Sequence, residues 1–285
     1  MSRLPSWIRL SLCTDQGFNH VHSLISSHKL NTVCESAKCP NRHACWNRGT
    51  ATMMILGDVC TRDCKFCAIK TGRPLPLDYD EPRRVASAAK SMNLNHVVIT
   101  SVARDDLDDG GAGIFAETIS AIRDELPEAS IEVLTPDFDS KIENLDQVLK
   151  ARPDVFNHNL ETVKRFQPLI RPQASYGRSL ATLKHAASSP IRPAIKSGMM
   201  LGLGETEEEI VEAMGDLVSV GCELLTLGQY LRPTPDHIKV NRYVAPDEFN
   251  HFADRAREIG FKGVASGPMV RSSYKADELL AQLRS

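Results

Sequence analysis

Short apolar runs recur along the chain, and most of them end in polar or glycine residues, as buried parallel strands do. Six runs follow this pattern, at residues 51–56, 96–100, 131–134, 155–160, 195–200 and 224–227. Helical patterns lie between them, at residues 82–92, 114–125, 179–187 and 206–220. Strands that alternate with helices of this length form parallel βαβ units. The pattern therefore predicts an α/β fold, a partial (β/α)6 TIM-type barrel.

The loops that follow the predicted strands are where a site is expected. In barrels of parallel strands, the active site is built from the loops at the carboxyl ends of the strands. Polar or glycine clusters follow five of the six strands, and a loop rich in cysteine follows the first. The pattern thus directs attention to that loop.

Composition and charge exclude several classes of function. The 285 residues are 42% hydrophobic and 25% charged, with a net charge of −2, so no overall field favours nucleic acid or an anionic membrane. No apolar run approaches the roughly 20 residues that cross a bilayer. Pro5 and the short apolar run around it argue against a secretory signal. Eight cysteines outside a secretory context predict a reducing, cytoplasmic location.

Three cysteines crowd the loop after the first strand, at Cys60, Cys64 and Cys67, spaced CxxxCxxC. Iron–sulfur clusters and structural zinc sites normally close with four protein ligands, so a local set of three leaves one metal position open. The alternatives are a zinc knuckle with a distant fourth ligand, or three unrelated core cysteines. The tight spacing favours a metal or cluster site.

A second set of three cysteines precedes the first strand, at Cys34, Cys39 and Cys45, spaced CxxxxCxxxxxC. Zinc motifs usually come as CxxC pairs, so the wider spacing favours a loop wrapped around a larger cluster. A zinc site that includes His43 is the alternative interpretation.

These motifs, with Phe66 before the last cysteine and Arg271-Ser272-Ser273-Tyr274 near the C-terminus, resemble the lipoyl synthase family of the radical S-adenosylmethionine (SAM) superfamily. The resemblance covers residues 31–276 and implies the same partial barrel. It implies two [4Fe–4S] clusters: one on Cys60, Cys64 and Cys67 that binds SAM, and an auxiliary one on Cys34, Cys39 and Cys45. It also implies that a serine of the Arg-Ser-Ser-Tyr motif is the fourth auxiliary ligand, and we choose Ser273 over Ser272. A serine oxygen is a harder, more easily displaced ligand of iron than a thiolate.

The resemblance implies a reaction and its partners. A 5′-deoxyadenosyl radical from SAM would remove hydrogen from C6 and C8 of an octanoyl chain, and the auxiliary cluster would donate the sulfur. The octanoyl group would be carried on a lysine of a lipoyl carrier protein, such as an E2 subunit or the glycine-cleavage H protein. The electron donor would be ferredoxin or flavodoxin. Nucleic acid and membrane are not expected partners.

Three segments are predicted: an N-terminal extension with the auxiliary cysteines at 1–50, the barrel at 51–245, and a C-terminal extension with the Arg-Ser-Ser-Tyr motif at 246–285. Because each extension supplies ligands to one cluster, the two are expected to pack together over one barrel mouth.

Polar residues at the strand ends are the candidates for binding SAM. Thr100, Ser101 and Val102 follow the second strand, where superfamily members usually contact the methionyl amino group through loop backbone. Asn157, Asn159 and Glu161 share one face of the fourth strand by alternation. Three polar groups are hard to satisfy against a helix layer, so we predict that this face points inward and His158 outward.

Further candidates come from the later strands. Lys196 lies on the fifth strand and Gln229 at the end of the sixth. Arg178, with Arg171 nearby, offers a guanidinium for a carboxylate, although surface pairing is the alternative.

Two other functions are weighed against this interpretation. One is a different sulfur-inserting radical SAM enzyme with an auxiliary cluster, of the biotin synthase or methylthiotransferase type. The other is a zinc-binding interaction module without catalysis.

Overall fold

The computed structural model describes residues 4–9 and 14–283, and an eight-stranded sheet forms its centre. The strand order is β1-β2-β5-β6-β7-β8-β9-β10, in which β1 is antiparallel to β2 and every other neighbouring pair is parallel. The strands are β1 (Asn31–Thr32), β2 (Thr52–Ile55), β5 (His96–Ser101), β6 (Ser130–Leu134), β7 (Val155–Asn157), β8 (Ala194–Leu201), β9 (Leu224–Gln229) and β10 (Gly263–Gly267). The predicted fold class and all six predicted strands are confirmed. A separate ribbon pairs β3 (Val59–Cys60) with β4 (Lys70–Thr71).

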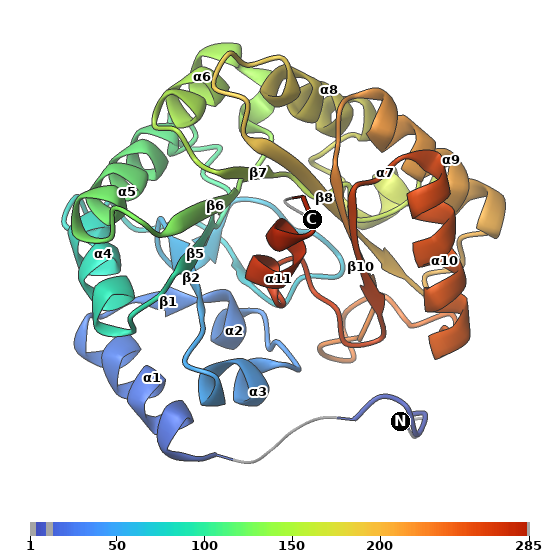
Figure 1. The fold of residues 1–285 in the computed structure, drawn as a ribbon, viewed down its shortest axis with the longest axis horizontal. Helices are drawn as coiled ribbons and strands as arrows, with labels where there is room; N and C mark the ends of the chain where they lie inside the picture. The colour runs from blue at the N-terminus through green and yellow to red at the C-terminus, as the bar shows by residue number, and fades with distance from the viewer. Residues whose placement is uncertain (1–3, 10–13, 284–285) are drawn as a thin grey trace.

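Helices cover the outside of this curved sheet, as Figure 1 shows. The covering helices are α4 (Glu81–Ser91), α5 (Ala112–Glu125), α6 (Ile142–Lys150), α8 (Tyr176–Ala187), α9 (Glu207–Ser219) and α10 (Pro246–Ile259). Shorter or flanking ones are α1 (Gln16–Ser27), α2 (Val33–Ser36), α3 (Arg42–Asn47), η1 (Phe138–Ser140), η2 (Lys164–Phe166), α7 (Gln167–Ile170) and α11 (Ala276–Ala281). The predictions for α4, α5, α8 and α9 are confirmed, whereas α6 and α10 were not predicted. In the described part of the chain, no helix has the length and apolar content to cross a membrane.

Alternation divides each strand between two environments. Val97, Ile131 and Ile195 belong to the core shared with the helices, so they point outward from the barrel. Their neighbours Glu132 and Lys196 therefore point inward. The inner face is therefore polar at this level, which is unusual for a packed barrel.

The sheet continues past the predicted boundary at residue 245. β10 lies in the segment assigned to the C-terminal extension, yet it pairs with β9 from Gly263 to Gly267 as a seventh parallel strand. The sequence GVASG lacks the β-branched run that identified the other strands. Its strand conformation comes from pairing with β9 and from packing against α10.

The C-terminal helix covers one end of the barrel. Leu279 and Leu280 of α11 pack against Val155 and Leu224, the first residues of β7 and β9. These are the amino ends of the strands, opposite the end where the cysteine loop lies. Figure 1 shows α11 at the centre of the ring of strands, viewed from that end.

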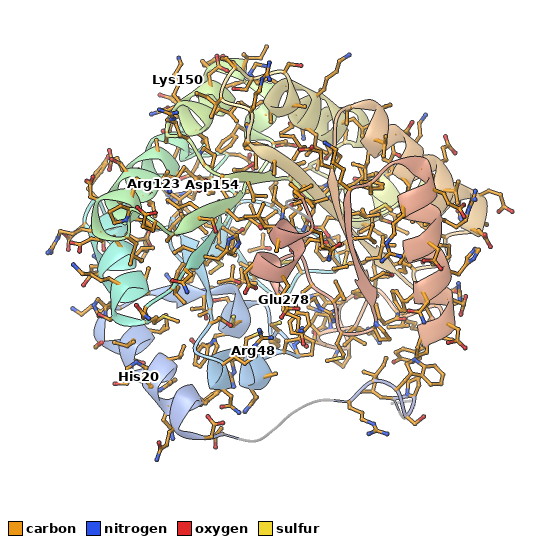
Figure 2. The ribbon with its side chains drawn as sticks, viewed as in Figure 1. His20, Arg48, Arg123, Lys150, Asp154 and Glu278 are labelled. Carbon is orange, nitrogen blue, oxygen red and sulfur yellow. The ribbon has the colours of Figure 1, made fainter. Side chains whose placement is uncertain are left out.

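The two extensions pack against each other, as the sequence predicted, whereas their place over one barrel mouth stays a prediction. Asn41 Nδ2 donates to Met269 O at 2.7 Å, and Arg48 of α3 pairs with Glu278 of α11 at 3.3 Å. Figure 2 shows Arg48 and Glu278 side by side where α3 meets α11. The auxiliary cysteines and the Arg-Ser-Ser-Tyr motif are thereby brought to the same side of the molecule.

Candidate functional site

The cysteine loop 60–67 is held by three different parts of the barrel. Thr61 N and Oγ1 donate to Ala103 O at 3.1 and 3.0 Å. Lys65 N donates to Ile170 O at 2.9 Å, and a ring nitrogen of His237 lies 2.9 Å from Cys67 O. These partners follow β5, β7 and β9, so the loop lies over the carboxyl ends of the strands, where the alternation placed the site.

The thiols of this loop are poised for a metal centre. Burial raises the pKa of Cys64 to about 11 and that of Cys67 to about 12, and each is raised further by the neighbouring thiols of the loop. A buried thiolate needs a cation to compensate its charge, and iron supplies one. Cys64 and Cys67 therefore suit ligands of a metal centre, and the half-buried Cys60 lies on the same loop.

The second triplet gathers around α2 and α3. Burial raises the pKa of Cys34 to about 11 and that of Cys45 to about 12, and each of these thiols responds electrostatically to Cys39. The perturbing thiols belong to the same triplet in each case, so the six cysteines form two groups.

Within the described residues, no three His, Cys, Asp or Glu side chains come together as a site for one metal ion, so neither triplet is closed around a single ion in the structure. A cluster of several irons spreads its ligands more widely than the tetrahedron around one zinc does. The His43 ring stacks on Phe18 of α1 with centroids 4.9 Å apart, and its buried Nδ1 has no hydrogen-bond partner.

The Arg-Ser-Ser-Tyr motif lies beside the auxiliary cysteines. The positive charge of Arg271 lowers the pKa of Cys39, although burial raises it overall, so the guanidinium is close to that thiol. Ser272 and Ser273 follow in the same half-buried turn. The choice of Ser273 as the iron ligand stays a prediction.

Gly228 makes this close approach possible. A Cβ atom there would lie 2.2 Å from Val270 O and 3.3 Å from Arg271 Nη1. The lack of a side chain at the end of β9 thus lets the segment before Ser272 lie directly on the sheet.

We expect Gly228→Ala to displace the Arg-Ser-Ser-Tyr turn and to lower the free energy of unfolding by about 1–3 kcal/mol, as overpacking does. Gly215→Ala is the matched control, because nothing lies within 4 Å of a Cβ at this α9 position. It should stabilise the helix by about 0.5–1 kcal/mol. Urea denaturation checks both, and equal stability of the two variants would contradict the packing argument.

The residues predicted from the second strand lie next to Cys60. Thr100 Oγ1 donates to Leu134 O at 3.0 Å, and Val102 is buried in the core, so backbone is what this segment offers a ligand. Ala103 N, the next donor, lies 3.3 Å from Cys60 Sγ. The Ser101 hydroxyl is buried without a hydrogen-bond partner, so it suits a polar group of a ligand.

The fourth strand is oriented as alternation predicted. His158 bonds to Ser179 of the outer helix α8 at 3.0 Å, so it points outward. Asn159 and Glu161 bond to each other at 3.0 Å, and Glu161 raises the pKa of both Cys64 and Cys67. Its carboxylate therefore lies near the cysteine loop.

Glu161 combines strain with burial. Its φ of +70° is left-handed, a conformation that costs a residue with a side chain about 1–3 kcal/mol and that clusters at functional sites. Burial raises the pKa of its carboxyl group, and Arg171 partly offsets this. A buried carboxylate of this kind suits a positively charged ligand group.

Asn157 and Lys196 belong to a buried network deeper in the barrel. Lys196 Nζ lies 2.8 and 2.9 Å from the two carboxylate oxygens of Glu132, and Asn157 Nδ2 donates to Glu132 at 2.9 Å. The side-chain oxygen of Asn157, Oδ1, has no hydrogen-bond partner. Contact of these two residues with SAM stays a prediction, and the structure adds the stabilisation of Glu132 to their roles.

Gln229 and Arg178, two other predicted SAM-binding residues, already bond to groups of the protein. Gln229 Nε2 donates to Tyr230 O and Arg242 O, and its Oε1 accepts from Val244 N, so the side chain fixes the segment after β9. Arg178 pairs with Asp137 and Asp139, each at 2.7 Å. These contacts favour loop anchoring over the predicted grip on a SAM carboxylate.

Arg171, the other arginine of the predicted pair, also bonds to groups of the protein but acts on the cysteine loop. Its Nη1 donates to Asn159 O, Leu160 O and Ser179 Oγ at 3.2, 3.3 and 3.2 Å, and its charge partly offsets the rise that burial causes in the pKa of Cys64. The sequence showed both arginines, but only the course of α7 places Arg171 beside the cysteine loop. Glu132 was not predicted, because it lies in an apolar run where only its charge distinguishes it.

Comparison with known proteins decides the family. The Radical SAM superfamily model matches residues 54–217. A lipoyl synthase of Chlorobium limicola is 52% identical over 97% of this chain and 95% of its own length, and one of Bacillus subtilis is 50% identical over 97% and 93%. The chain belongs to the lipoyl synthase family. It is a radical SAM enzyme of the sulfur-inserting kind, and the zinc-module and biotin synthase alternatives are set aside.

Solved structures bear out the fold of this lipoyl synthase family member. A methylornithine synthase superposes with a TM-score of 0.55 at 13% identity, over 87% of this chain and 74% of that one. A maturase of the [FeFe]-hydrogenase gives 0.60 at 15% identity, over 81% and 54%. Membership of the family implies SAM and [4Fe–4S] chemistry, for which the buried thiols and unpartnered polar atoms described above are suited.

Proposed function

We propose that this enzyme inserts two sulfur atoms, at C6 and C8 of a protein-bound octanoyl-lysine, to form the lipoyl group. The observation that carries the proposal is the presence of two separate buried thiol triplets, one over the strand ends and one beside the Arg-Ser-Ser-Tyr motif. Generating a radical and delivering sulfur are distinct tasks, and each triplet serves one of them.

The residues divide between the two tasks. Cys60, Cys64 and Cys67 would hold one [4Fe–4S] cluster, and Cys34, Cys39, Cys45 and Ser273 the other. When bound, the first supplies an electron to split SAM and the second supplies the sulfur. The segments at 1–50 and 246–285 serve the second cluster, and the barrel at 51–245 serves the first.

The chain's own groups would hold SAM by charge and shape. Backbone at Thr100 to Val102 and the carboxylate of Glu161 suit the methionyl amino group, while Arg171 suits the carboxylate. The partnerless oxygens of Asn157 and Asn159 suit hydroxyl donors of the ribose. The amino end of the barrel, which α11 covers, keeps water away from a radical formed at the carboxyl end.

The substrate would arrive on a carrier protein. E2 subunits and the glycine-cleavage H protein are the proposed carriers, and ferredoxin or flavodoxin the proposed electron donor.

The test is mass spectrometry of an octanoylated carrier after anaerobic turnover with SAM and a reductant. Replacement of two hydrogens by two sulfurs on the modified lysine is expected. Formation of 5′-deoxyadenosine with an unchanged octanoyl mass would refute the proposed reaction.

A further inference from the structure

A buried ion network lies directly beneath the cysteine loop. Arg62 stands between Cys60 and Cys64 in sequence, yet only 7% of its side chain is exposed. Its Nε lies 3.1 and 2.8 Å from the two carboxylate oxygens of Asp105, and its Nη2 lies 2.6 Å from Asp105 Oδ1. The same Nη2 pairs with Asp137, which is fully buried, at 2.7 Å. One guanidinium thus joins the cysteine loop to two carboxylates.

The two carboxylates come from different strand-end loops. Asp105 follows β5 and also accepts from Thr61 Oγ1 at 2.8 Å, and Asp137 follows β6 and pairs with Arg178. A planar guanidinium fork holds two acceptors in a fixed geometry, which a flexible ammonium does not. The network therefore fixes the position and orientation of the cysteine loop relative to the carboxyl ends of the strands.

This anchoring bears on the hydrogen bonds that Cys60 accepts. Its Sγ atom accepts from two backbone N–H groups, Arg62 N at 3.4 Å and Ala103 N at 3.3 Å. The second donor belongs to the loop that Asp105 ties to Arg62. Hydrogen bonds to a ligating sulfur stabilise the more negative, reduced state of an iron–sulfur cluster and raise its potential.

We propose that Arg62 is a positioning residue that sets the reduction potential of the cluster on Cys60, Cys64 and Cys67. By tying the loop to Asp105 and Asp137, it keeps the N–H groups of Arg62 and Ala103 directed at Cys60 Sγ. The proposal rests on the proposed function only in requiring a cluster on this loop.

The test is a redox titration followed by electron paramagnetic resonance, in a Cys34→Ala, Cys39→Ala, Cys45→Ala background so that only the loop cluster is observed. We expect Arg62→Met to bind as much iron as the parent but to show a more negative midpoint potential. Arg62→Lys, which keeps the charge but loses the fork, should shift it in the same direction by a similar amount. An unshifted potential in Arg62→Lys would show that the charge of Arg62 alone sets the potential and would overturn the proposal. Arg84→Met is the matched control, because Arg84 of α4 makes a 2.8 Å ion pair with Asp78 away from both triplets.

An unchanged midpoint potential in Arg62→Met would overturn the proposal, as would an equal shift in Arg84→Met. If Arg62→Met and Arg62→Lys both fold, by circular dichroism, but bind no iron, then Arg62 builds the loop and does not tune it, which also overturns the proposal. The titration uses no octanoyl substrate, so failure of sulfur insertion would leave its outcome unaffected.

Discussion

Ser273→Ala is expected to keep cleavage of SAM and to lose the lipoyl product. The Cys60 loop lies over the strand ends, and among the described residues Ser273 makes no hydrogen bond to it, so 5′-deoxyadenosine should still form. The auxiliary cluster would lose its proposed oxygen ligand. Product should fall by at least roughly 10–100-fold, the range already seen when a group that merely supports a metal ligand is removed. Separate quantification of 5′-deoxyadenosine and dithiolated product checks both halves.

Ser272→Ala is the matched control, one residue away in the same half-buried turn. It should retain product if Ser273 is the ligand. The reverse result would move the ligand to Ser272. Equal loss of 5′-deoxyadenosine and product in Ser273→Ala would refute the division of labour between the two triplets.

The strands that were predicted share a physical signal. Residues 97–99, Val-Val-Ile, are all buried, so this strand carries a continuous β-branched apolar signal. β10 lacks that signal, since Gly263 must leave room for Leu224, to which a Cβ there would approach within 2.5 Å. A strand whose glycines allow close packing carries little local propensity, so its place in the sheet depends on tertiary contacts.

The site was predictable where the chemistry is local. Both cysteine triplets stand out by spacing alone, because the three thiols of each proposed cluster lie close together in the chain. Charged residues were harder to assign. Arg171 and Arg178 look alike in sequence, and only the fold brings one to Cys64 and the other to Asp137. Arg62 lies inside the cysteine motif, but its role was not predicted. Its partners Asp105 and Asp137 come from two loops that are distant in the sequence.

Lys196→Met is expected to destabilise the protein by about 3–5 kcal/mol, the usual cost of removing one partner of a buried ion pair. Lys196 is 0% exposed and Glu132 1% exposed, so without the ammonium the carboxylate is left with Asn157 and His96 alone. Urea denaturation of the protein without its clusters measures the effect. The double variant Lys196→Met, Glu132→Gln is the control. It removes both charges and should recover more than half of the loss.

The Glu132–Lys196 pair also determines how the free energy of unfolding changes with pH. Burial alone would raise the pKa of Glu132, but Lys196 and His96 outweigh it and lower the pKa from 4.5 to about 2. A depressed carboxyl pKa contributes stability that is present above pH 4.5 and is lost as the pH falls towards 2. The parent protein should therefore lose stability across this window more steeply than the double variant. Equal dependence of stability on pH in the two proteins would mean that the ionisation of Glu132 does not depend on Lys196 in solution. The ion pair would then not explain why the barrel interior is polar around these two residues.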